Sequence, residues 1–310
     1  MTHPSAESLA GPPFGPPAGP PAGPRGESTG ETLLYAYGVR RSTAGKPDGL
    51  PAIAGILPGC PVQAVAHHGL AALVSEVPKA VFSGEAIKER LRDDAWVAAR
   101  VLDHHRVLTT VPGEALLPLQ FCTLFTDRQA LAGALERCRD DLLAALAAVG
   151  RAREWGVKLF VDYAALCRAV KATTPQLVRL ARRAAAAAPG AAFFLKRKLD
   201  DMTWQAAVDA AAARAAAIHK GLIDAARAGG RQPVQPRTHH GRRQDMLLNA
   251  AYLVPEEAED RFRAVIDGLA AQHRAAGLRF EVVGPLPPYS FARMQVGDDG
   301  KGDDRERARP

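Results

Sequence analysis

The chain has 310 residues, of which 47% are hydrophobic and 24% are charged, and its formal net charge is +7. This composition is that of an ordinary soluble protein, and the length predicts two folded domains. No run of about 18 apolar residues is available to cross a bilayer, and residues 1–30 lack the basic start and apolar centre of a signal peptide. We therefore expect a cytoplasmic protein without a membrane partner.

The N-terminal half follows an arm rich in proline, glycine and alanine at residues 1–30, which we expect to be disordered because it has few large apolar side chains. An α/β domain is predicted over residues 31–150. Its strands are expected at 33–39, 62–66, 70–77 and 115–125, with His67-His68-Gly69 as a hairpin turn, and its helices at 83–108 and 126–149.

Both helices of this half are predicted from an apolar stripe. In the second, Thr126 is expected to be the N-cap, Gln129 completes a capping box, and Gly150 ends the helix. In the first, the stripe is expected to consist of Ile87, Leu91, Ala98 and Leu102, with His105 continuing it as a packed imidazole.

A ferredoxin-like domain is predicted over residues 151–296, because the expected elements of the C-terminal half follow the order strand, helix, strand, strand, helix, strand. The residues after 296 form a charged tail at 297–310, which we expect to be flexible. Strands are expected at 153–162, 232–238, 246–254 and 278–282, and the main helices at 191–228, ending at Gly229-Gly230, and after Pro255. The predicted fold class is therefore α+β.

The sequence predicts no enzymatic activity, no cofactor and no bound metal. The chain lacks the glycine-rich phosphate motifs and the H-E-x-x-H zinc motif. Asp103, His104 and His105 cannot converge on one ion, because neighbours on a helix point about 100° apart. The cysteines are expected to be packed thiols, since they form no C-x-x-C pair; they are Cys60, Cys122, Cys138 and Cys167.

Two segments are candidates for binding a partner. Residues 232–238 carry two prolines, which fits only an edge strand, and such an edge can pair with an extended segment of another chain. Residues 284–291 have two interpretations: a rigid strand exit whose aromatic rings pack on the core, or an extended docking segment. The candidate partner-binding residues are Gln232, Val234, Gln235, Arg237, Tyr289 and Phe291.

Several segments together resemble the gas vesicle GvpF/GvpL family in order and spacing. They are LYAYG at 34–38, LLPLQFCTLF at 116–125, EWGVK at 154–158, LNAAYLV at 248–254 and GPLPPYSF at 284–291. The chain departs from the usual family pattern at Gln120 and Cys122, where the family reads Arg and Gly, and at Leu286, where it reads Trp.

The resemblance implies a two-domain, non-enzymatic accessory protein of the gas vesicle that binds the hydrophobic main shell protein and other accessory gas vesicle proteins. The alternative is a basic nucleic-acid-binding module, because positive charge is concentrated between Arg151 and Arg243. That alternative requires exposed aromatic rings on the second sheet, and Phe160 and Tyr252 are the candidates. Without an RNA-binding pattern, we expect no nucleic-acid partner.

Overall fold

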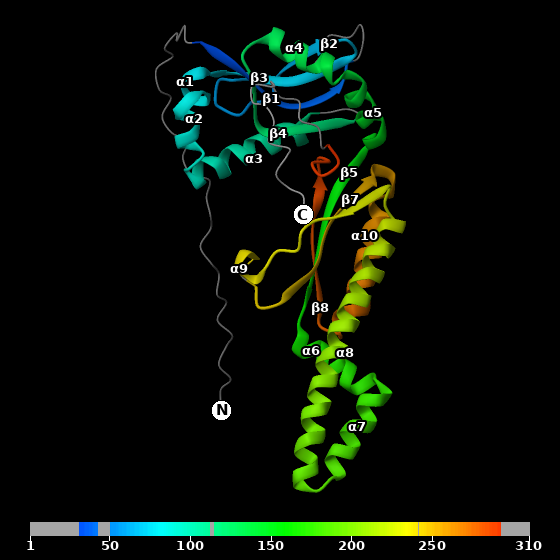
Figure 1. Ribbon diagram of the computed structural model, residues 1–310. Helices are drawn as coiled ribbons and strands as arrows, with labels where there is room; N and C mark the ends of the chain where they lie inside the picture. The colour runs from blue at the N-terminus through cyan, green and yellow to red at the C-terminus, as the bar shows by residue number, and fades with distance from the viewer. Residues whose placement is uncertain (1–30, 43–49, 112–114, 241, 293–310) are drawn as a thin grey trace, which may run out of the picture.

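Two four-stranded antiparallel sheets, one from each half of the chain, organise the fold (Figure 1). The computed structural model describes residues 31–42, 50–111, 115–240 and 242–292. The predicted arm at 1–30 and the predicted tail at 297–310 lie outside these residues. No helix in the described parts of the chain combines the length and apolar character needed to cross a bilayer.

The first sheet has the order β2-β3-β1-β4 and is covered by helices on both faces (Figure 1). Because side chains alternate along a strand, Tyr35 and Tyr37 of β1 pack with α1 and α3, whereas Leu34 and Ala36 pack with α4 and α5. The elements are β1 (Thr32–Arg41), β2 (Gln63–His67), β3 (Leu70–Pro78), α1 (Lys79–Phe82), α2 (Gly84–Arg90), α3 (Asp94–Thr110), β4 (Leu116–Phe125), α4 (Arg128–Arg137) and α5 (Arg139–Val149).

The helix predicted at 83–108 is wrong in two respects. It is divided into α2 and α3, because Asp93 caps a new helix by accepting hydrogen bonds from Ala95 N at 3.0 Å and Trp96 N at 3.2 Å. The predicted stripe also selects the wrong face of α3, because Leu102 is exposed, and His104 is buried instead of His105. Leu91, also predicted to be buried, is exposed at the break.

The helix predicted at 126–149 is also divided, at Cys138, which ends α4 and precedes α5. Its N-cap is Asp127 rather than Thr126, because the Asp127 carboxylate accepts a hydrogen bond from Ala130 N at 2.8 Å. Gly150 ends α5 with a positive φ of 51°, as the sequence predicts.

The second sheet has the order β6-β7-β5-β8, and its elements alternate as in a ferredoxin-like fold. Trp155, Val157 and Leu159 of β5 face a core that they share with α6, α8 and α10. The elements are β5 (Ala152–Val161), α6 (Tyr163–Thr173), α7 (Pro175–Ala186), α8 (Pro189–Asp224), β6 (Ala228–Arg231), α9 (Arg237–His240), β7 (Asp245–Pro255), the 3-10 turn η1 (Glu256–Ala258), α10 (Glu259–Arg274) and β8 (Leu278–Leu286).

The predicted edge strand at 232–238 is wrong, because the edge strand is β6, which ends at Arg231. Gly229, expected to end a helix, pairs with Tyr252 of β7, and a side chain at Gly229 would lie 2.8 Å from the Tyr252 ring. Only glycine therefore lets β6 approach this ring. Pro233 and Pro236 have no amide N–H and cannot continue the ladder, and the chain instead enters α9.

The two sheets are in direct contact. Ala152 and Leu253 of the second sheet belong to the apolar core that α4 and α5 form on the first. Only Gly150 and Arg151 separate the end of α5 from the start of β5, so a short covalent link joins the two halves.

Candidate functional site: the groove between the sheets

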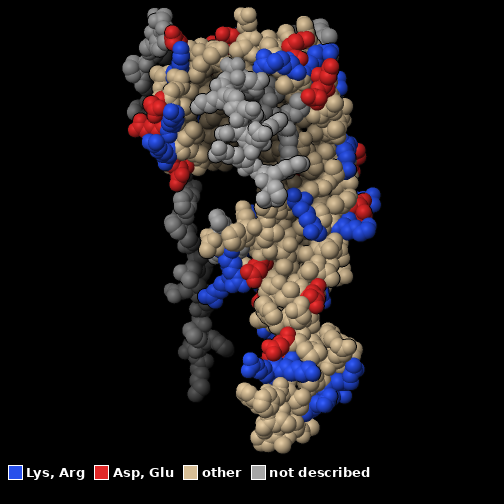
Figure 2. All heavy atoms as spheres, viewed as in Figure 1, with Lys and Arg blue, Asp and Glu red and all other residues tan. Residues whose placement is uncertain are grey.

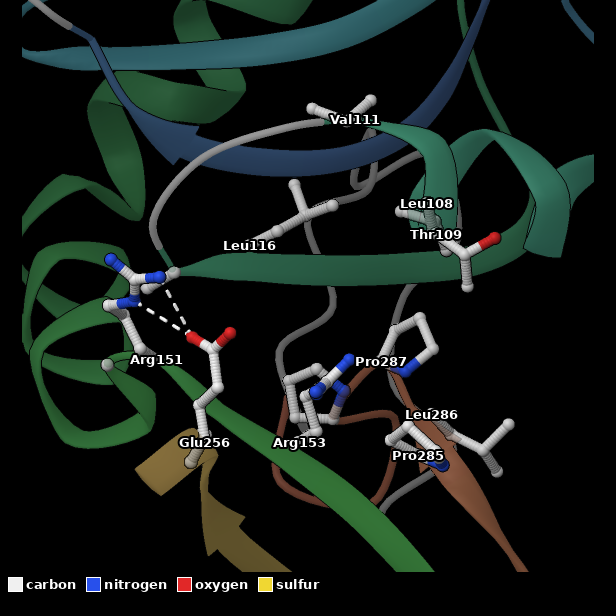
Figure 3. Close-up of a pocket in the computed structure, with 14 residues that line it drawn as sticks. Leu108, Thr109, Val111, Leu116, Arg151, Arg153, Glu256, Pro285, Leu286 and Pro287 are labelled. Atoms are coloured by element: carbon white, nitrogen blue, oxygen red, sulfur yellow. Dashed lines mark hydrogen bonds and ion pairs between the residues drawn. The ribbon is translucent and has the colours of Figure 1, made fainter. Parts of the chain in front are cut away.

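A groove of about 460 Å³ lies where the two halves meet (Figure 3). We call it the junction groove. Its walls come from the end of α3, the start of β4, the start of β5, and the end of β8 with the residues that follow it. The apolar part of the lining consists mainly of Leu108, Val111, Leu116, Pro285, Leu286 and Pro287.

Two arginines give the junction groove its polar side. Arg151 Nε and Nη2 lie 3.1 and 2.9 Å from Glu256 Oε2 (Figure 3). Arg153 Nε and Nη2 donate to the two carboxylate oxygens of Glu259, at 2.5 and 3.0 Å. A guanidinium has five N–H donors, and each of these arginines uses two of them toward carboxylates. The remaining donors suit carbonyl or carboxylate oxygens of an occupant.

The segment at residues 284–291, which we call the closing loop, is bound to both halves. Its Ser290 donates from N and Oγ to the two oxygens of Glu154, at 2.6 and 2.7 Å. Gln232 Nε2 donates to Ser290 Oγ at 2.8 Å. On the other side, Tyr289 Oη lies 3.1 Å from His105 Nδ1 of α3, and Phe291 packs on the apolar core of the first sheet.

The side chain of Glu154, which the closing loop contacts, is buried. The alternation of β5 places its side chain on the face opposite Trp155 and Val157, yet only 6% of Glu154 is exposed. Burial raises the pKa of this carboxyl, although the two hydrogen bonds from Ser290 oppose the shift. Burial also raises the pKa of Tyr289 to about 12, with a further contribution from the charge of Glu154.

His104 fixes the wall that α3 contributes. Its Nδ1 lies 2.8 Å from the Tyr35 hydroxyl, which also accepts a hydrogen bond from Cys122 N at 3.2 Å. Burial lowers the pKa of His104 to about 4. The Leu119 carbonyl opposes this shift without reaching good hydrogen-bond geometry with Nε2, whereas the neighbouring His105 adds to it.

The predicted partner-binding residues fall into two groups. Gln232, Tyr289 and Phe291 meet at the closing loop. The others do not join them: Val234 is half exposed, Gln235 is exposed, and Arg237 binds Asp245 with atom pairs at 2.5 and 2.6 Å. Sequence reasoning missed Arg151, Arg153, Glu256 and Glu259 as site residues; charged residues immediately after Gly150 and Pro255 are the signal that was available.

One cluster has the donor atoms of a metal site. His67 Nε2 and His68 Nδ1 lie 3.1 and 2.6 Å from the same oxygen of Glu136. The two imidazole rings are stacked with an angle of 13° between their planes. Both ring nitrogens approach the same carboxylate oxygen, so in this arrangement the two rings bind Glu136.

The aromatic residues that a nucleic-acid-binding sheet requires are buried. Only 2% of Phe160 is exposed, and Tyr252 is fully buried, with its hydroxyl 2.7 Å from His219 Nδ1. Neither ring is available to stack on a base. The nucleic-acid alternative therefore loses the feature on which it depends.

Comparison with known proteins identifies the family. The model of the family described as gas vesicle synthesis protein GvpL/GvpF matches residues 33–293. The chain belongs to this family. It is 30% identical over 275 residues to gas vesicle protein L of Streptomyces sp. strain CB03234, covering 86% of this chain and 96% of that protein. Gas vesicle protein F of the same strain is 32% identical over 260 residues, which cover 83% and 98% of the two chains.

Two crystal structures of GvpF share this fold. GvpF from Anabaena sp. PCC7120 superposes with a TM-score of 0.57 at 18% identity, covering 85% of this chain and 97% of the solved one. GvpF from Microcystis aeruginosa gives a TM-score of 0.56 at 20% identity, with coverage of 84% and 99%. The chain therefore has the α+β fold of GvpF and a role related to gas vesicles.

The structure shows where two departures from the GvpL/GvpF pattern lie. Cys122, at a position where we expect glycine, has a φ of 65°, in the left-handed region that glycine occupies without strain. Leu286, at the position expected to be tryptophan, lines the junction groove. Its smaller side chain presents less surface to an occupant than an indole would.

Proposed function

We propose that this protein supports gas vesicle formation without catalysis, by binding the main gas vesicle shell protein in the junction groove. A shell subunit needs an apolar face toward gas, and before assembly that face is prone to aggregate. A partner that covers part of it keeps the subunit available for assembly. This role places the protein at the gas vesicle, together with other accessory gas vesicle proteins.

The observation that carries the proposal is the composition of the junction groove. Its apolar wall suits hydrophobic side chains, and the unused donors of Arg151 and Arg153 suit backbone carbonyls of an extended segment. The closing loop, which includes Tyr289 and Phe291, forms one border. Partner binding by Gln232, Val234, Gln235, Arg237, Tyr289 and Phe291 themselves stays a prediction.

Two neighbouring threonines provide a matched test. Thr109 lines the junction groove, whereas Thr110 is exposed on the next position of α3 and is not among the lining residues. Both hydroxyls donate to carbonyls of their own helix, Thr109 to His105 O at 3.0 Å and Thr110 to Arg106 O at 2.7 Å. Thr109→Trp fills the groove, and Thr110→Trp adds the same surface outside it.

The assay is co-purification of the co-expressed main shell protein with the tagged full-length chain. We expect Thr109→Trp to reduce the recovered shell protein about tenfold or more, because a filled groove excludes the occupant, and Thr110→Trp to leave it unchanged. Equal recovery with both variants would exclude the groove as the binding site. Failure of the wild-type chain to retain any shell protein at any salt concentration would exclude the proposed function itself.

A further inference from the structure

The far end of the second half carries two exposed aromatic rings. α7 and α8 form a hairpin that extends beyond the second sheet (Figure 1). Near its tip, 63% of Phe193 and 72% of Phe194 are exposed, and their rings lie 5.6 Å apart at an angle of 81°. Large aromatic side chains this exposed are uncommon unless a partner covers them.

Packing within the hairpin does not require these rings. α7 and α8 contact one another through Leu180, Leu195 and Leu199, which belong to the core of the second half or pack against it. Phe193 and Phe194 occupy the other faces of α8. Their exposure is therefore separate from the contacts that hold the hairpin together.

Basic side chains surround the two rings. On a helix, residues three and four positions apart are neighbours, so Phe193 stands beside Lys196 and Arg197, and Phe194 beside Arg197 and Lys198. Figure 2 shows basic residues gathered next to the end of this hairpin. α7 adds Arg182 and Arg183, and none of these five cations forms an ion pair with a carboxylate of the described residues.

We propose that this tip, defined as Phe193, Phe194 and the five cations, docks on a second gas vesicle protein through an apolar depression edged by carboxylates. The charge of the tip selects an acidic surface, and the two rings are the anchors. The exposed aromatic pair is confined to two consecutive positions, which fits a local depression in a protein, whereas a helix lying on a membrane needs an apolar face along its length.

This inference rests on the proposed role in the gas vesicle, but it uses a different surface. The junction groove lies between the two sheets, and the tip is at the opposite end of α8 from the sheet (Figure 1). With 36 residues, α8 has a length of about 54 Å. One molecule is therefore able to hold the shell protein at the groove and a second gas vesicle protein at the tip.

The test measures binding of the full-length chain to each gas vesicle protein of its source organism, purified separately, at 50 and 300 mM NaCl. The tip variant is the double substitution Phe193→Ser and Phe194→Ser. Trp204→Ser is the control, because Trp204 is also an exposed aromatic residue of α8. Circular dichroism verifies that the variants keep their helix content, and liposomes of phosphatidylglycerol test the membrane alternative.

We expect at least one gas vesicle protein to bind the wild type with a Kd that rises about tenfold or more in the tip variant and also rises at high salt. Trp204→Ser and Thr109→Trp should retain this binding. The inference is overturned if no such protein distinguishes the tip variant from the control, if Thr109→Trp abolishes the same binding, or if only liposomes or a second copy of the chain depend on the two phenylalanines. The two proposals can fail separately. If Thr109→Trp leaves binding of the shell protein unchanged, the groove proposal fails; the inference about the tip still holds if the tip variant loses its own partner.

Discussion

Acid should detach α3 from the first sheet, because it charges an imidazole that the fold holds neutral. Only 3% of His104 is exposed, and burial lowers its pKa to about 4. With the ring neutral, the Tyr35 hydroxyl donates to Nδ1 across 2.8 Å. Protonation turns Nδ1 into a donor and leaves the Tyr35 proton without this acceptor.

The size of the effect follows from the two pKa values. An ordinary histidine has a pKa of 6.5, and His104 has a pKa of about 4 in the folded protein. Between these values the unfolded chain binds more protons, so the stabilisation is complete above pH 6.5 and is lost as the pH falls toward 4. At about 1.4 kcal/mol per pH unit, the loss amounts to about 3 kcal/mol, a large part of the stability of a typical domain.

Urea unfolding at pH 7, 5.5 and 4 measures this loss. In His104→Asn, the side-chain oxygen replaces Nδ1 as acceptor without titrating in this range. We expect the free energy of unfolding to fall about 3 kcal/mol less between pH 7 and 4 in this variant than in the wild type. His105→Asn, one position further on α3, should keep most of the wild-type dependence, because burial is the largest cause of the His104 shift. Parallel curves for the wild type and His104→Asn would refute the reasoning.

Three further predictions concern Glu154, Gly55 and Cys122. Because burial raises the pKa of Glu154, its contribution to stability is present below the unfolded pKa and is lost as the pH rises; the unfolding free energy of Glu154→Gln should therefore increase relative to that of the wild type from pH 4 to 7, and a relative decrease would contradict this. A side chain at Gly55 would lie 2.0 Å from Cys60 O, so Gly55→Ala should lower the unfolding free energy by about 3 kcal/mol or more, whereas Gly190→Ala, with nothing within 4 Å, should be tolerated in the same thermal melt. Cys122→Val should lower the unfolding free energy, because a β-branched residue tolerates a positive φ less well than cysteine, and Cys122→Gly should lower it less in urea unfolding; the opposite order would show that the lost side-chain packing dominates.

β5 was predictable because its side chains alternate along the strand, with Trp155, Val157 and Leu159 on the face toward the core. β6 was placed four residues too late, because two glycines in a strand of four residues leave no alternation to follow. Only the approach to Tyr252 shows why glycine is required there.

The first helical face was not predictable from period alone. A stripe continues only while the helix is unbroken, and the cap at Asp93 starts a second helix in the middle of the predicted segment. The site was harder still, since Arg151 and Glu256 are 105 positions apart in sequence. Contacts between residues so far apart in the sequence arise from the order of the strands, and no local sequence motif predicts them.

The closing loop gives a physical reason for the junction groove to respond to its occupant. Ser290 binds β5 through Glu154, while Phe291 packs on the first sheet. The walls of the groove therefore come from two halves whose relative position this loop helps to fix. A ligand that contacts both walls binds only the arrangement in which they face one another, so its binding free energy adds to the stability of that arrangement. Weakening the contacts of the loop should consequently reduce affinity, even when the altered residues never touch the ligand.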